Sequence, residues 1–92
     1  MDLQTLRTQI DKIDDELILL FGRRMDVSAE IARYKRQNGI PVFDSEREKQ
    51  KLCDLSQKTT DKYKQYITAL YSLIFDLSRA EQEKTIQMED PL

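Results

Sequence analysis

The sequence predicts an all-α fold of three helices, and three observations support this prediction. Apolar side chains between residues 3 and 34 recur in alternating steps of three and four, the spacing of one face of an α-helix. The 92 residues contain only 2 Gly and 2 Pro, and one of each falls within residues 38–42. No stretch alternates apolar and polar residues as a half-buried strand does. We therefore expect a single helical domain over residues 1–92.

The first predicted helix, about residues 3–37, carries this apolar stripe for about five heptads. At ~1.5 Å per residue it is roughly 50 Å long, which is too long for a compact chain of this size. A lone chain of 92 residues buries only roughly 60–65% of its unfolded surface. We therefore expect a partner chain to cover the stripe, although a simple coiled coil would satisfy the same pattern.

The first helix should end near Gly39, because glycine suits a left-handed C-cap and Pro41 cannot continue the hydrogen-bond ladder. A second helix is expected over about residues 44–57. Ser45 and Glu48 are spaced as a capping box, in which each residue satisfies a free backbone N–H near the start of a helix.

The third predicted helix covers about residues 62–87, with Thr60 or Asp61 as its N-cap. Ser78 and Gln82 lie one turn apart and continue the apolar face of this helix. Buried polar side chains need hydrogen-bond partners, so each requires either a structural partner or a ligand.

The composition excludes several kinds of site. The chain has no His and one Cys, so it offers no imidazole base, no Cys/His zinc site and no intrachain disulfide. We expect no metal and no cofactor. The net charge of −2 gives no basic field that would attract nucleic acid or an anionic membrane. The N-terminus does not resemble a signal peptide and no apolar run is long enough to span a membrane, which predicts a cytoplasmic protein.

Two cations lie on the apolar stripe of the first helix. Arg24 stands between Leu20 and Val27, and burying it without a partner would cost several kcal/mol. Lys35 points within about 20° of the same direction, about 16 Å further along the helix. The anionic partner of Arg24 is either an acidic side chain of another helix or a bound ligand.

A third cation, Arg7, precedes Arg24 by 17 residues, or about 25 Å along the helix. One small molecule cannot contact both from a single chain. If two copies of the helix pair antiparallel about residues 17–20, Arg7 of one chain falls between Arg24 and Lys35 of the other. Gly22, close to this crossing, either allows close approach of a partner backbone or is merely tolerated.

Eight residues in this order resemble the pattern of the all-helical chorismate mutases, including the domain found at the N-terminus of some bifunctional prephenate enzymes. The resemblance extends from residue 3 to about residue 82. It implies an intertwined homodimer in which the long first helices cross and each site takes one arginine from the other chain. The residues that carry it are Arg7, Arg24, Lys35, Asp44, Arg47, Glu48, Ser78 and Gln82.

The resemblance also implies roles for the residues that bind carboxylates. Arg24 and Arg7 of the partner chain would bind the two carboxylates of chorismate, with Arg47 and Ser78 assisting. Arginine suits this role because its planar fork binds a carboxylate through two hydrogen bonds and stays charged.

The remaining residues of the pattern are implied to act on the ring and the bond that breaks. Lys35 and Gln82 would donate to the ether oxygen, and Glu48, with the backbone near Asp44, would hold the ring hydroxyl. The implied activity is the intramolecular Claisen rearrangement of chorismate to prephenate, in phenylalanine and tyrosine biosynthesis. This isomerisation needs no nucleophile, metal or proton relay, which agrees with a chain that lacks His.

Two other functions stay open at this point. An isochorismate-pyruvate lyase has the same helical fold and a similar set of Arg, Lys and Gln residues. A helical dimerisation or regulatory module without activity would have the same fold. The suitability of all eight polar positions for ligand binding favours an enzyme, and Ser78 with the segment 44–48 favours the mutase over the lyase.

Overall fold

The computed structural model describes residues 2–89, which form three α-helices and no strand. They are α1 (Leu3–Gln37), α2 (Ser45–Ser56) and α3 (Lys64–Glu89). The prediction of an all-α fold of three helices is confirmed. No helix among the described residues has a stretch long and apolar enough to cross a membrane.

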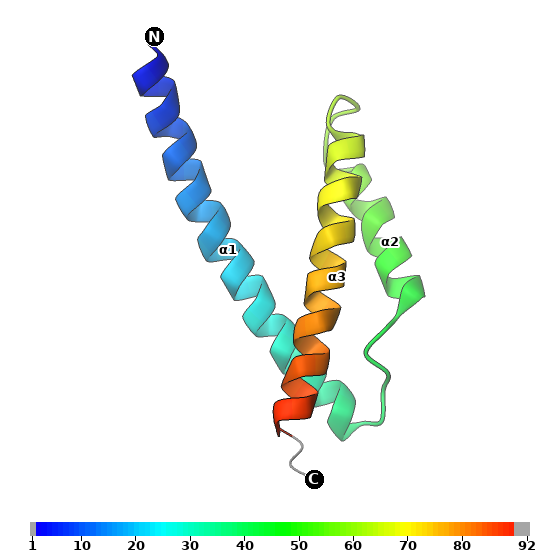
Figure 1. Cartoon of the computed structure of the whole chain (residues 1–92). Coiled ribbons are helices and arrows are strands. Elements are labelled where there is room, and N and C mark those ends of the chain that lie inside the picture. The colour runs from blue at the N-terminus through cyan, green and yellow to red at the C-terminus, as the bar shows by residue number, and fades with distance from the viewer. Residues whose placement is uncertain (1, 90–92) are drawn as a thin grey trace.

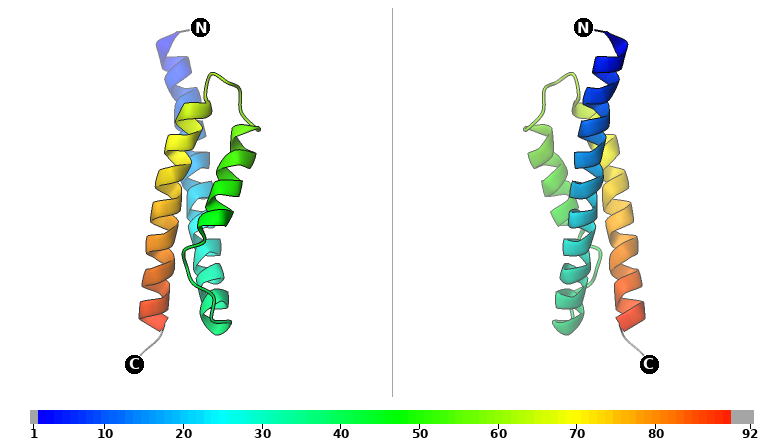
Figure 2. Two further views of the ribbon diagram at one scale, coloured as in Figure 1. Left: turned by 90° about the vertical axis from the view of Figure 1, so that its right-hand side faces the viewer. Right: turned by 90° about the vertical axis from the view of Figure 1, so that its left-hand side faces the viewer.

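The three helices run roughly along one long axis, so the chain is elongated, with extents of 58 × 27 × 14 Å (Figure 2). α1 and α3 converge toward their C-terminal ends and diverge toward the N-terminus of α1 (Figure 1). Helix α3 contacts both α1 and α2, so it is the central element of the chain.

Both ends of α1 are formed by local signals. At the start, the Asp2 carboxylate accepts a hydrogen bond from the backbone N–H of Thr5 at 2.7 Å. At the end, Gly39 adopts a φ of 66°, a left-handed conformation that is cheap only for glycine. The chain then turns back, and the N–H of Ile40 donates to the carbonyl oxygen of Lys35 at 2.8 Å.

The prediction of a capping box at the start of α2 is wrong. Asp44 is the N-cap, and its carboxylate accepts from the backbone N–H of Arg47 at 3.0 Å. Ser45 is therefore the first helical residue and not the cap. The Glu48 side chain does not reach back to the helix start, because it pairs with Arg79 of α3.

Helix α3 begins at Lys64 rather than at about residue 62, and continues to residue 89 rather than 87. The residues before it form a turn in which the N–H of Tyr63 donates to the carbonyl oxygen of Thr60 at 3.0 Å. This i→i+3 bond closes a tighter turn than an α-helix has, so the regular helix starts later than the apolar pattern suggests.

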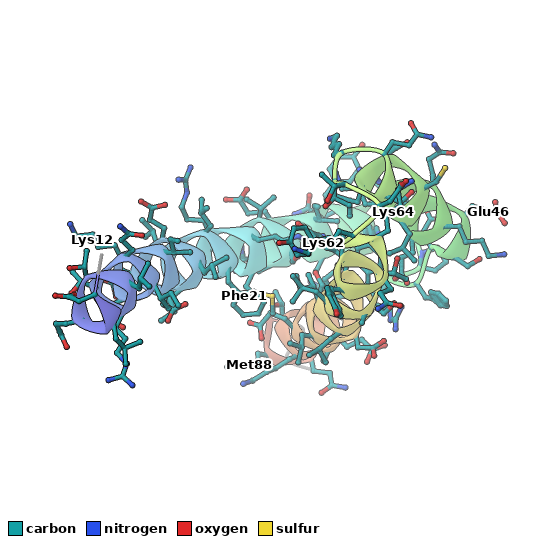
Figure 3. All side chains as sticks on the ribbon, turned by 90° about the horizontal axis from the view of Figure 1, so that it is seen from above. Lys12, Phe21, Glu46, Lys62, Lys64 and Met88 are labelled. Atoms are coloured by element: carbon teal, nitrogen blue, oxygen red, sulfur yellow. The ribbon has the colours of Figure 1, made fainter. Side chains whose placement is uncertain are left out.

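The chain by itself buries very little apolar surface. Among the described residues, only Ala32 and Phe75 are buried hydrophobic residues. The N-terminal arm, defined here as residues 3–22 of α1, projects away from the other two helices when the molecule is seen from above (Figure 3). Its apolar stripe is open to solvent, with Leu3 60% and Leu17 58% exposed. Exposed apolar area of this extent is typical of a surface that contacts another molecule.

Candidate active site

A pocket of about 430 Å³ lies between the C-terminal half of α1, the start of α2 and the C-terminal half of α3. Among the described residues, five cationic side chains but only two carboxylates line it. The excess of positive charge favours an anionic ligand. The cations are Arg24, Lys35, Arg47, Lys51 and Arg79, and the carboxylates are Asp44 and Glu48.

Arg24 faces this pocket without an acidic partner in the part of the chain that the structure describes. Its Nη1 donates to the hydroxyl oxygen of Ser78 at 3.3 Å, and its guanidinium carbon lies 5.9 Å from the ring centroids of both Tyr71 and Phe75. Within residues 2–89 no carboxylate forms an ion pair with it. The described residues therefore provide no internal ion pair for Arg24, and its charge remains available to a ligand.

A pair of buried serines joins α1 to α3 at the pocket. The hydroxyl oxygens of Ser28 and Ser78 are 2.5 Å apart, and the two residues are only 4% and 6% exposed. This contact fixes Ser78 where it can accept from Arg24. Ser28 was not among the predicted site residues, although it lies one turn after Arg24 on the same face.

Lys35 and Gln82 line the same pocket. The ammonium group of Lys35 donates to the carbonyl oxygen of Val42 at 2.8 Å, because the chain reverses after α1 and returns beside its last turn. Gln82 is 8% exposed, and its Oε1 is a buried polar atom without a hydrogen-bond partner among the described residues. A buried amide oxygen left unpaired costs free energy, and a ligand in the pocket can remove that cost.

Glu48 is paired with a residue that the sequence pattern missed. The Nη1 of Arg79 lies 2.6 Å from each oxygen of the Glu48 carboxylate. Arg79 also pairs with Asp76, and its guanidinium carbon lies 4.8 Å from the centroid of the Phe43 ring. The only local signal for Arg79 was its position three residues before Gln82, which puts both on one side of α3.

The first turns of α2 supply the exposed rim of the pocket. Asp44 and Arg47 line it as expected, and Lys51, one turn after Arg47, lines it although it was not predicted. Seven of the eight residues of the sequence pattern thus meet within the described chain. Arg7 does not, because it lies on the arm, about 25 Å before Arg24 along α1.

The donors of the pocket are guanidinium, ammonium, amide and hydroxyl groups, which are the groups that bind oxyanions. No group of three or more His, Cys, Asp and Glu side chains within residues 2–89 is placed to hold a metal ion.

Comparison with known proteins connects this pocket to a family. The sequence profile of the chorismate mutase type II family matches residues 6–83, which include all eight residues of the sequence pattern. The chain belongs to this family. The resemblance inferred from the sequence is thereby confirmed, and the helices of this chorismate mutase type II domain account for most of the matched residues.

Three relatives illustrate the range of the chorismate mutase type II family. A bifunctional chorismate mutase/prephenate dehydratase of Buchnera aphidicola (subsp. Schizaphis graminum) is 35% identical over 92% of this chain and 23% of its own length. A chorismate mutase of Methanocaldococcus jannaschii is 39% identical over 55% of this chain and 58% of its own. A 4-amino-4-deoxychorismate mutase of Streptomyces venezuelae is 40% identical over 46% of this chain and 41% of its own.

The chain thus spans less than a quarter of the length of the bifunctional relative and about half that of the two others. No solved structure matches the chain significantly.

Proposed function

We propose that this domain is a chorismate mutase, which converts chorismate to prephenate by an intramolecular Claisen rearrangement. One observation carries the proposal: Arg24 faces the cationic pocket without an acidic partner among the described residues, and the buried amide of Gln82 lines the same pocket. A dicarboxylate supplies the anion that Arg24 requires, and an ether oxygen beside it can accept a hydrogen bond from the amide N–H of Gln82. Family membership and the relatives named as chorismate mutases support the same substrate.

In this proposal the carboxylates of chorismate are held by arginines. Arg24 binds one carboxylate through its planar fork, and Ser78 holds the guanidinium in place. Arg47, at the exposed rim, adds a second charge on the side of α2. Arg7 of a partner chain completes the set. Holding the flexible enolpyruvyl group of chorismate over its ring removes conformational entropy before the chemical step.

Lys35 and Gln82 act where charge develops. As the C–O bond breaks and the C–C bond forms, negative charge grows on the ether oxygen, and both side chains carry N–H donors that can stabilise it. Gln82 donates without titrating. If orientation and this stabilisation each supply roughly 3–5 kcal/mol, the rate rises by a factor on the order of 10⁵ to 10⁶.

Glu48 holds the ring hydroxyl, together with the backbone near Asp44. A carboxylate accepts hydrogen bonds only, so it suits a hydroxyl donor on the substrate. Glu48 lines the pocket from the first turn of α2, whereas Arg24 and Lys35 line it from α1.

We further propose that the functional unit is an intertwined homodimer. The apolar stripe of the arm is exposed, and an open apolar groove of about 530 Å³ lies between α1 and α3 beside Arg24. A second copy that fills the groove with its own arm would bury both surfaces and carry Arg7 toward the pocket. Gly22 has no atom within 4 Å of the position of a Cβ, so its place in the helix leaves room for a partner's backbone.

The test is turnover by the purified domain. With chorismate we expect formation of prephenate, and with isochorismate we expect no release of salicylate and pyruvate. Salicylate from isochorismate without prephenate from chorismate would replace the proposal with a lyase. Binding of neither compound by a stable dimer would point to a dimerisation or regulatory module. The cytoplasmic location expected from the sequence stays a prediction.

A further inference from the structure

The Glu48 carboxylate, which lines the pocket, forms an ion pair with Arg79 of α3. One nitrogen of Arg79 contacts both oxygens of the Glu48 carboxylate at 2.6 Å. The two side chains are 26% and 24% exposed, so water screens the pair less than a fully exposed one. Both residues line the pocket. A ligand that reaches Glu48 therefore meets a carboxylate whose charge is already compensated.

Arg79 is held in this position independently of any ligand. Asp76, one turn earlier on α3, pairs with its other terminal nitrogen, and the Phe43 ring lies against its guanidinium. The Asp76 side chain is 64% exposed, so its charge is largely screened. Glu48 is the less exposed of the two carboxylates that Arg79 contacts, so the guanidinium charge mainly offsets that of Glu48.

This arrangement discriminates between two kinds of hydrogen-bond donor. A neutral hydroxyl can donate to a carboxylate oxygen without disturbing the ion pair. An alkyl amine is an ammonium ion near pH 7, and the positive charge of Arg79 opposes it. Both substituents occur on the substrates named for relatives, because one relative acts on chorismate and another on its 4-amino-4-deoxy analogue.

We propose that Arg79 is a positioning residue that orients Glu48, compensates its charge and thereby makes the pocket prefer a ring hydroxyl over a ring ammonium. The inference rests on the proposed function, because it takes Glu48 as the residue that contacts the ring substituent. It goes beyond that function by assigning substrate choice to a residue outside the eight of the sequence pattern.

The experiment compares kcat/KM for chorismate and for 4-amino-4-deoxychorismate at pH 7. The variants are Arg79→Gln, which removes the charge, and Arg79→Lys, which keeps it. Lys84→Gln is the matched control, because it removes an exposed cation from the same helix outside the pocket. Circular dichroism and the mass of the assembly in solution show whether each variant is folded as the unaltered chain is.

For Arg79→Gln we expect the ratio of the two kcat/KM values to shift about tenfold toward the amine, since an unpaired carboxylate attracts the ammonium. The loss with chorismate should lie mainly in KM, because the ring hydroxyl is not part of the bonds that break or form. Arg79→Lys should keep most of the preference, and Lys84→Gln should change nothing. If Arg79→Gln is poorly folded, Glu48→Gln is the second variant: it leaves the Arg79 charge uncompensated and should strengthen discrimination against the amine.

If Arg79 has a purely structural role, its loss should lower both kcat/KM values equally. An unchanged ratio of the two values in both Arg79→Gln and Glu48→Gln would therefore overturn the inference. It would not contradict the proposed mutase function. Failure of the unaltered chain to convert either compound would instead remove the proposed function, and the inference with it.

Discussion

The two halves of α1 carry the same apolar periodicity and have different surroundings. The C-terminal half packs against α3 and contains the two residues of α1 that are buried, Ser28 and Ala32. The arm, residues 3–22, has no buried residue at all. Helical spacing by itself therefore does not reveal which part of a stripe is covered within the chain and which part is left for another molecule.

The difference has a chemical side as well. Where α1 meets α3, polar groups interrupt the stripe, and they meet across the pocket: Arg24 with Ser78, and Ser28 with Ser78. Along the arm the stripe is continuously apolar, and its one cation that belongs to the sequence pattern, Arg7, has no place in the pocket of its own chain. One half forms a site, and the other offers an interface.

The largest effect is expected at the packed half. Arg24→Ala should lower kcat/KM for chorismate by at least about 10²-fold, because it removes a charged donor that lines the pocket and that we propose binds a substrate carboxylate. Lys35→Ala and Gln82→Ala should each cost at least about tenfold. Arg23→Ala, an exposed neighbour outside the pocket, is the control for lost charge. Normal turnover in all three pocket variants would show that the site is elsewhere.

The arm should be most sensitive at its apolar stripe. Leu17→Asp puts a charge where we propose the partner packs, and should raise the dissociation constant of the dimer by about 10²-fold or more, as each chain loses a buried leucine. Analytical ultracentrifugation measures this shift. Thr8→Asp adds the same charge on the opposite face of the arm and should leave the assembly intact. A Leu17→Asp chain that assembles normally would remove the arm from the interface.

The two halves can also be tested together. Arg7→Ala and Arg24→Ala chains should each be inactive alone, yet recover activity after subunit exchange, because one of the two sites in a mixed dimer is intact. Random pairing predicts about a quarter of the activity of the unaltered protein, since half of the dimers are mixed and each has one good site. Absence of recovery in mixtures whose exchange is verified would contradict a shared site.

A smaller effect is expected at the buried serine pair. Ser28→Ala removes one hydrogen bond between α1 and α3, and should lower the free energy of unfolding by about 1 kcal/mol. Urea denaturation at fixed protein concentration measures the change. Thr68→Ala, which removes an exposed hydroxyl of α3, is the matched control and should cost less. Equal losses in the free energy of unfolding would mean that the Ser28–Ser78 contact stabilises the packing of α1 on α3 no more than an exposed hydroxyl does.

The smallest effect is expected at the first turn of the arm. The backbone N–H of Thr5 lowers the pKa of Asp2 below its ordinary value of 3.8. The capping contribution is therefore complete above pH 3.8 and is lost as the pH falls through the lower pKa of the folded state. Amide exchange at Thr5 should accelerate in that range. Asp2→Asn should abolish this pH dependence, and an unchanged profile in the variant would exclude the cap as its cause.

The helices and much of the pocket could be predicted because their signals are local. The periodicity of α1, the stop near Gly39 and the polar residues on otherwise apolar faces can all be recognised within a few turns of sequence. The positions of Arg24, Lys35, Ser78 and Gln82 on those faces were enough to nominate them. Their meeting in one pocket follows from α1 packing against α3.

The prediction from the sequence was wrong where a side chain can form a hydrogen bond with more than one partner. Ser45 and Glu48 have the spacing of a capping box, but Asp44 is one residue earlier and caps the helix instead. Glu48 was then free to pair with Arg79, 31 residues away. The Asp44 cap is a local contact, but no local pattern predicts the Glu48–Arg79 pair, because that pair forms only when α2 packs on α3.

The sequence by itself determined the helical class, the length of α1, the excess of cations along its stripe and the family, since all of these depend on residue order within one element. Only the tertiary structure decided that Arg24 has no acidic partner within residues 2–89 and that Glu48 pairs with Arg79. Those two facts depend on which helices pack together, because electrostatic and hydrogen-bond partners are set by distance in space, and the turns between helices determine that distance.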